Sequence, residues 1–210
     1  MKLKTSILYF FLLIVTVADS QSSDGKDKLA AKKDSMILAK FKTKGASYPV
    51  VKESKLSGAM PIANVTDKPV PGMKYKLLFD FVTPTNDPKN KTQVMNRGLA
   101  EIGRVINLHI AAGVDPKDLD IVIVTHGKAL YSLYNNEAFK RELKTDNPNI
   151  AILDEIKNAG ATIVACGQAL EFLDIKQENL LPSVKIALSA KNALSTYLLK
   201  GYVRFDIDED

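Results

Sequence analysis

Two side chains in the sequence have the types and positions that a thiol reaction needs. Cys166 is the only cysteine among the 210 residues, and it ends the apolar run "ATIVAC". His126 ends a second apolar run, "IVIVT", and is followed by a glycine. A cysteine thiolate is a nucleophile, and a histidine can carry a proton because its charge changes near neutral pH. We therefore treat Cys166 as a candidate nucleophile and His126 as a candidate for proton transfer or positioning.

Cys166 is open to three interpretations, because a chain with one cysteine forms no internal disulfide. It can be a buried inert thiol, since free cysteine is among the most buried residue types. It can be a reactive thiol, or it can cross-link to another molecule. The stretch "GQALEFL" after it is predicted to be helical, and the first N–H groups of a helix carry partial positive charge that favours the thiolate. In that case the backbone of Gly167 and Gln168 supports the thiol, and Gly167 leaves room beside it for a substrate or a second sulfur.

Neither of the two histidines belongs to a recognisable metal or cofactor motif. The structural alternative for His126 is a ring that is hydrogen-bonded to a backbone carbonyl, and His109 near the end of a predicted helix is favoured as structural because a cation suits that position. The histidines and the cysteine come from distant segments without metal-ligand spacing, so we expect no metal site. The chain has no Walker loop, no G-x-S-x-G and no G-x-G-x-x-G, and we expect no cofactor.

Alternating strand and helix patterns from residue 75 onward would position these side chains. Five apolar runs predict strands: 75–81, 119–127, 161–166, 183–189 and 203–207. Five helical patterns lie between them: 91–112, 136–144, 150–160, 168–175 and 190–202. Strands that alternate with helices indicate βαβ units. We therefore expect an α/β fold, a single three-layer sandwich with a mostly parallel five-stranded sheet flanked by helices.

The predicted sheet brings the two candidate residues to the same edge. In open parallel sheets, ligands and reactive groups gather at the carboxyl ends of the strands. His126 lies at that end of the second predicted strand and Cys166 at that end of the third. The order of the strands in the sheet, and so the separation of the two side chains, does not follow from the sequence.

Residues 1–20 have the pattern of a cleavable secretory signal. Two lysines precede a short apolar core, and Ala18 and Ser20 supply small residues at the −3 and −1 positions. The apolar core is shorter than the roughly 20 residues that a spanning helix needs. We expect an exported protein, periplasmic or secreted, that begins near Gln21 and has no transmembrane span after signal cleavage. An uncleaved N-terminal anchor is the alternative.

Residues 21–73 are predicted to form a basic arm that contains proline and glycine. It precedes the α/β domain at 74–207 and an acidic tail at 208–210. A net charge of +5 is compatible with nucleic-acid binding, but stacking on bases needs interleaved aromatic residues, and the lysine-rich part of the arm has only Phe41. We therefore expect a solvated, partly helical or disordered arm and no nucleic-acid partner. Weak attraction to an anionic membrane surface is the alternative.

Four segments carry a family resemblance by their order and spacing: "RVINLHIAAGV", "IVIVTHGKAL", "NPNIAILDEIKNAGATIVACGQAL" and "LLPSVKIALSAKNALSTYLLKGY". From about Tyr75 to Asp206 the chain resembles the DsrE/DsrF-like family, most specifically in "ACGQ" and "ALSAKNAL…GY". The resemblance implies a compact α/β sandwich, often assembled as a homo-trimer or hexamer. Members of its sulfur-relay branch carry persulfide sulfur on a cysteine that matches Cys166.

The resemblance implies a carrier that accepts sulfane sulfur on Cys166 and passes it on, rather than a multiple-turnover enzyme, and the signal pattern of residues 1–20 makes it an exported one. Its partners would be other copies of itself and a sulfur donor or acceptor protein. Lys128 stands where the family has proline or glycine, and the sulfur-relay members are cytoplasmic, unlike the exported protein expected here. Two alternatives stay open: a non-catalytic oligomeric binding module of the cell envelope, and a thiol redox sensor.

Overall fold

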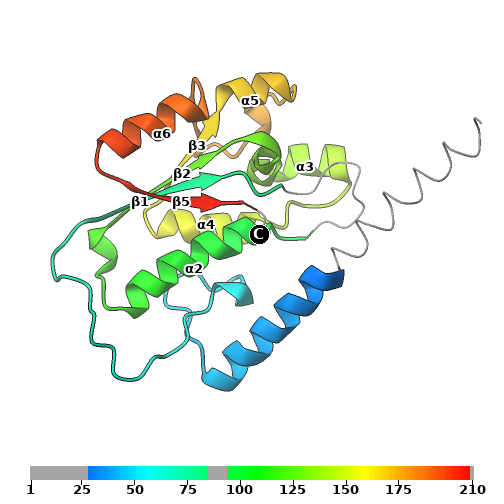
Figure 1. Ribbon diagram of the computed structural model, residues 1–210. Helices are drawn as coiled ribbons and strands as arrows, with labels where there is room; N and C mark the ends of the chain where they lie inside the picture. Colours follow the sequence, from blue (N-terminus) through cyan, green and yellow to red (C-terminus); the bar gives the residue numbers. More distant parts are fainter. Residues whose placement is uncertain (1–27, 85–93, 209–210) are drawn as a thin grey trace, which may run out of the picture. The chain divides into compact units, whose positions relative to one another are not determined.

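The computed structural model describes residues 28–84 and 94–208 (Figure 1). The predicted signal peptide at 1–20 and the start of the predicted arm lie outside the described residues. So do most of the acidic tail and the first three residues of the helix predicted from 91. The chain divides into two compact units, Met1–Lys44 and Gly45–Asp210, and each is described by itself.

In the first unit, residues 28–44 form a helix. Most of its residues are exposed, including the apolar Leu29 and Met36, whereas Phe41 is buried. Across the described parts of both units, no helix combines the length and the apolar character that crossing a membrane requires.

The second unit is built on a parallel sheet, to which its described residues contribute five strands. The strands are β1 (Tyr75–Phe81), β2 (Leu119–Thr125), β3 (Thr162–Cys166), β4 (Lys185–Ala187) and β5 (Val203–Ile207). Their order in the sheet is β4-β3-β2-β1-β5, and each neighbouring pair is parallel. The predicted α/β fold is therefore confirmed, with a sheet that is wholly rather than mostly parallel.

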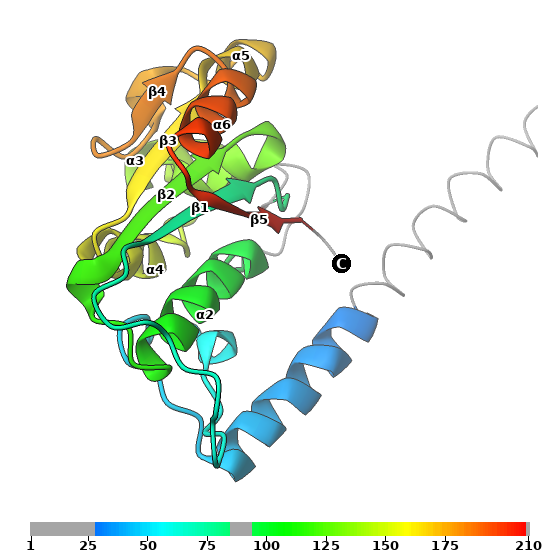
Figure 2. The ribbon, with the colours of Figure 1, turned by 60° about the vertical axis from the view of Figure 1, so that its left-hand side comes forward.

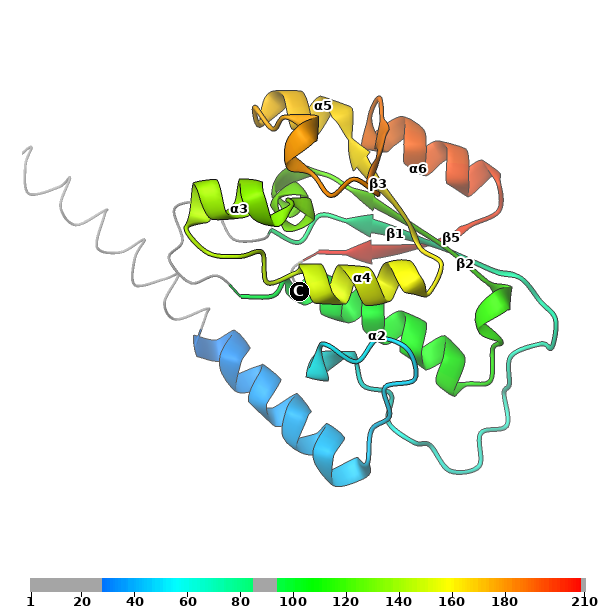
Figure 3. The same cartoon turned by 180° about the vertical axis from the view of Figure 1, so that it is seen from behind.

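Helices cover both faces of the sheet, as Figures 2 and 3 show from two directions. The helices are α2 (Arg97–Ala111), α3 (Asn136–Leu143), α4 (Ile150–Asn158), α5 (Gly167–Phe172) and α6 (Ala190–Leu199). Short 3-10 turns lie before β1 and in the connections: η1 (Lys55–Ser57), η2 (Pro116–Asp118), η3 (Gly127–Leu133) and η4 (Gln177–Asn179). Helices α2 and α4 lie on one face and α6 on the other, which gives the three layers of an α/β sandwich.

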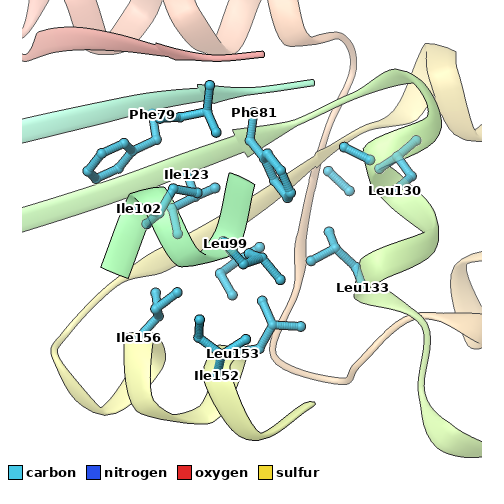
Figure 4. Close-up of a cluster of buried hydrophobic side chains, with 14 of the residues drawn as sticks. Phe79, Phe81, Leu99, Ile102, Ile123, Leu130, Leu133, Ile152, Leu153 and Ile156 are labelled. Carbon is cyan, nitrogen blue, oxygen red and sulfur yellow. The ribbon is translucent and has the colours of Figure 1, made fainter. Parts of the chain in front are cut away.

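The larger hydrophobic core lies between the sheet and the helices α2 and α4 (Figure 4). Alternation along β1 sends Phe79 and Phe81 into this core, where both side chains are fully buried. In α2, Leu99, Ile102 and Ile106 follow the helical spacing of three and four residues and pack against the strands. A smaller core of Val122, Val124, Val164 and other short side chains lies under α6.

A strap, residues 45–59, packs against α2 and belongs to the second unit. The fully buried side chain of Asn107 in α2 holds it in place. Its Oδ1 accepts hydrogen bonds from the backbone N–H groups of Val50 and Val51, at 3.1 and 3.0 Å. Its Nδ2 donates to the carbonyl oxygens of Val51 and Ser57, at 2.7 and 2.9 Å. One amide side chain therefore satisfies four backbone groups of a segment that has no sheet ladder of its own.

We expect Asn107→Leu to lower the free energy of unfolding by about 2–4 kcal/mol, because a buried backbone group left without a partner costs about 1–3 kcal/mol. Asn158→Leu, at the exposed end of α4, is the matched control, and its expected change is within about 0.5 kcal/mol. Urea unfolding of the two variants measures the difference. An Asn107→Leu variant as stable as the control would show that the strap does not depend on this amide.

Candidate functional site

Alternation along the strands gathers reactive and charged side chains on one face of the sheet at the carboxyl ends. Asp80 in β1, Cys166 in β3 and Arg204 in β5 share the face that bears the smaller core. Their sequence neighbours pack in the larger core on the opposite face: Phe81, Ala165 and Phe205. His126 directly follows β2 and reaches the same face, where its ring meets Asp80.

Strands β2 and β3 are neighbours, and this places His126 and Cys166 next to each other in the sheet. The register pairs Thr125 with Ala165, so His126 and Cys166 are the next residues along the two chains. Neighbouring strands are about 5 Å apart. The side chains of both residues line one open hollow of about 460 Å³, so the structure brings the two predicted site residues together.

The thiol of Cys166 forms part of the wall of this hollow. Cys166 is only 6% exposed, and its side chain packs with Val124, Val164 and Ala190 in the smaller core. The rest of the hollow is lined mainly by apolar atoms of α5, including those of Phe172, and by the start of η3. Cys166 is therefore a buried residue of the smaller core that also lines an opening.

His126 is anchored at both its backbone and its ring. Its backbone N–H donates to the carbonyl oxygen of Phe81 at 3.1 Å, which ties the end of β2 to β1. Its ring Nε2 lies 2.8 Å from Oδ1 of Asp80. The ring partner is thus a carboxylate, and not the backbone carbonyl that the structural alternative predicted.

Asp80 is a buried carboxylate held between two partners. Its second oxygen, Oδ2, lies 2.7 Å from Nη2 of Arg204, and the same nitrogen lies 2.6 Å from Oδ1 of Asp206. A buried charge needs such pairing, because an unpaired carboxylate in the interior is strongly unfavourable. Sequence reasoning missed Asp80 and Arg204 as site residues. The signal that could have found Asp80 was a lone carboxylate inside the aromatic strand "YKLLFDF".

The backbone of Gly167 and Gln168, which was predicted to support the thiol, contacts a neighbouring segment instead. The N–H of Gln168 donates to the carbonyl oxygen of Leu188 at 3.0 Å, so this group is occupied by the connection from β4 to α6. A Cβ added to Gly167 would lie 2.8 Å from the carbonyl oxygen of Ala187. The space beside Gly167 is therefore filled by the neighbouring backbone rather than left for a substrate. The side chain of Gln168 still lines the hollow.

His109 lies away from this site. Its Nδ1 is 2.8 Å from the carbonyl oxygen of Val105, one turn earlier in α2. Its ring makes edge contacts with Tyr75 and Phe205 on the face of the larger core. These contacts agree with the structural role expected from its place near the helix end. Among the described residues, no group of three or more His, Cys, Asp or Glu side chains is arranged to hold a metal ion.

Known protein families and solved structures include proteins that are similar to this chain. The model of the DsrE/DsrF-like family, which is generally linked to sulfur relay, matches residues 76–205. A solved structure of a protein of unknown function from Methanobacterium thermoautotrophicum is similar, with 17% sequence identity and a TM-score of 0.45. That match covers 63% of this chain and 98% of the other. No curated protein matches the chain. The family match spans more than half of the sequence and includes every residue of the site but Asp206, and the chain belongs to the DsrE/DsrF-like family.

Proposed function

We propose that this protein carries sulfane sulfur on Cys166, taking it from a donor and passing it to an acceptor thiol. The observation that carries the proposal is that one hollow is lined by both Cys166 and His126. Cys166 is the only cysteine of the chain, and the ring of His126 contacts the carboxylate of Asp80. The membership of the chain in a family linked to sulfur relay supports the same chemistry. The protein acts as a carrier, since one thiol can hold and release sulfur without further catalytic groups.

The proposed transfer is a thiol–persulfide exchange that needs no external oxidant or reductant. The thiolate of Cys166 attacks the outer sulfur of a donor persulfide. A new sulfur–sulfur bond forms at Cys166, the bond within the donor persulfide breaks, and the donor leaves as a thiol after it takes up the proton. Release to an acceptor thiol is the same exchange in reverse order, with the acceptor leaving as the persulfide.

The surroundings of Cys166 suit a carrier of a reactive group. Apolar atoms of Ala169, Phe172 and Leu173 line the hollow and keep bulk water from most of the thiol. The side chain of Phe172 is 88% exposed at the rim, so it can contact a donor or acceptor protein that docks over the hollow. A donor must reach a thiol that is only 6% exposed, which favours a persulfide on a flexible segment or a small polysulfide.

The proposal places this carrier outside the cytoplasm and in an assembly of identical subunits. Export rests on the signal-like pattern of residues 1–20, and the homo-oligomer on the family resemblance. Exposed apolar side chains at the end of α6 and before it, Leu199 and Leu188, offer surface for contacts between subunits. In this setting the sulfur donor and acceptor would be envelope or extracellular partners.

A non-catalytic binding module is the second candidate function, and one observation favours it. Cys166 packs with short apolar side chains of the smaller core, as an inert core cysteine would. In that case the exposed apolar side chains around the hollow would serve a partner protein, and the thiol would only fill space. The reactivity of the folded thiol separates the two functions.

We expect Cys166→Ser to abolish sulfur loading without unfolding the protein, because serine keeps the size of the side chain but cannot hold a persulfide. The protein is treated with inorganic polysulfide, and intact mass spectrometry counts added sulfur atoms. The thermal unfolding midpoint of the variant, compared with that of the wild type, is the control for folding. Sulfur retained by Cys166→Ser would place the acceptor atom elsewhere and sink the proposal.

We expect a small alkylating reagent such as iodoacetamide to label Cys166 in the folded protein, because Cys166 lines an opening. A bulky maleimide should label it several times more slowly than iodoacetamide, because Cys166 is only 6% exposed. Mass spectrometry of the tryptic peptide reads both rates, and the denatured protein supplies the reference. Labelling that requires denaturant for both reagents would favour the binding module.

A further inference from the structure

A chain of ion pairs and hydrogen bonds runs along the sheet face from β5 to the candidate site. It begins at Asp206, passes through Arg204 to Asp80, and ends at the ring of His126, with successive distances of 2.6, 2.7 and 2.8 Å. Strands β5 and β1 and the residue that follows β2 supply these side chains, and His126 lines the same hollow as Cys166. From this geometry we infer that Asp80, fixed by Arg204, is a positioning residue that orients His126 as the proton carrier for Cys166. The inference rests on the proposed function.

The hydrogen bond to Asp80 fixes which ring nitrogen of His126 carries the proton. An ionised carboxylate only accepts hydrogen bonds, so the neutral imidazole donates from Nε2. The Nδ1 atom then keeps its lone pair and is the basic nitrogen. A base whose tautomer and orientation are set by a third group is the arrangement found in nucleophile–histidine–carboxylate sites.

Arg204 and Asp206 explain how Asp80 can stay charged in the interior. With Asp80 buried, Arg204 supplies the compensating positive charge, and the exposed carboxylate of Asp206 holds the guanidinium from the other side. When His126 takes up a proton, the charges of the four side chains sum to zero. The carboxylate of Asp80 therefore contacts the imidazolium that forms when the thiol gives up its proton.

The charged groups around the imidazole come from several elements. Asp80 contacts it from β1, and Arg204 lies behind Asp80; Lys128 of η3 and Cys166 of β3 line the same hollow as His126. The smaller core under α6 contributes only apolar and aromatic side chains to this face. Asp80 is therefore the acidic group in direct contact with the ring among the described residues.

In the proposed exchange, Nδ1 of His126 takes the proton of the Cys166 thiol as the new sulfur–sulfur bond forms. The bond within the donor persulfide breaks, and the departing donor thiolate receives the proton from the imidazolium. Each transfer begins and ends with neutral His126. Asp80 contacts neither sulfur atom and acts only through the ring.

The first test is the tautomer of His126 in the wild-type protein, read by long-range ¹H–¹⁵N NMR near neutral pH. The chain has two histidines, and His109 is an internal standard because its Nδ1 must donate to the carbonyl oxygen of Val105. We expect the Nδ1–H form for His109 and the Nε2–H form for His126. A His126 ring protonated on Nδ1 would overturn the inference, whether or not Cys166 carries sulfur.

The second test compares the rate of Cys166 alkylation by iodoacetamide across pH. In Asp80→Asn we expect a rate about tenfold or more below wild type near neutral pH, since general-base assistance is typically worth more than this. At high pH the thiol ionises without a proton acceptor, and the two rates should converge. In Asp80→Asn the guanidinium of Arg204 keeps Asp206 as its partner, so the variant leaves no charge without a partner at this position.

Asp120→Asn is the matched control for Asp80→Asn. Asp120 lies near the amino end of β2, at the edge of the sheet opposite to the candidate site. Its Oδ2 accepts a hydrogen bond from the hydroxyl of Tyr202 at 2.7 Å. Burial, followed by this contact, raises the pKa of Tyr202 above its ordinary value. We expect wild-type alkylation rates and the wild-type His126 tautomer in this variant.

A double-mutant cycle with His126→Gln completes the test. If Asp80 acts through the ring, Asp80→Asn adds no further loss of alkylation rate in the His126→Gln background. A loss that is equal at every pH, or that persists without the histidine, would mean a merely structural role and overturn the inference. Alkylation measures the reactivity of the thiol itself and does not depend on sulfur loading. If sulfur loading fails while the alkylation rate of Asp80→Asn still shows the expected pH dependence, the carrier function is rejected and the role of Asp80 is not.

Discussion

The parallel pairing of β1 with both β2 and β5 is the constraint on which the site depends. In this arrangement the carboxyl ends of three strands lie at the same edge of the sheet. Residues that pair across neighbouring strands point to the same face of the sheet. Asp80 can then contact His126 on one side and Arg204 on the other. An antiparallel neighbour would present its amino end to Asp80, and the buried carboxylate would lose the partners that make its burial tolerable.

The two faces of the sheet have different roles. The face under α2 and α4 carries large side chains such as Phe79 and supplies most of the apolar burial of the domain. The face under α6 carries shorter side chains, and Ala190 and Ala193 let that helix approach closely. On this face, charged groups and an open hollow lie at the carboxyl edge beside the packed core.

Most of the fold could be predicted from the sequence because it follows from local periodicity. The apolar runs that become strands are short and bounded by turns, and the strand predicted at 75–81 matches β1 residue for residue. The placement of His126 and Cys166 at one edge needed only the assumption of parallel strands. Their closeness needed the strand order, which is a property of long-range packing.

The missing parts of the site all depend on contacts between segments far apart in the chain. Arg204 meets Asp80 only because the last strand in sequence lies beside the first. Gly167, the glycine after Cys166, suggested open space beside the thiol, but the backbone between β4 and α6 fills that space. No residue near Gly167 in the sequence predicts this contact. Local patterns thus predict elements and edges, whereas the partners of a buried charge require the tertiary arrangement.

The position of β5 also has a consequence for the order in which the molecule is completed. A ribosome delivers β1 long before β5, and domains tend to fold as the chain emerges. Until β5 pairs with β1, strand β1 is the edge of the sheet, and Asp80 has no guanidinium beside it. The last strand therefore completes the sheet and supplies the arginine partner of Asp80 in one step, so that a chain cut short before residue 203 leaves this carboxylate on the edge strand without its guanidinium.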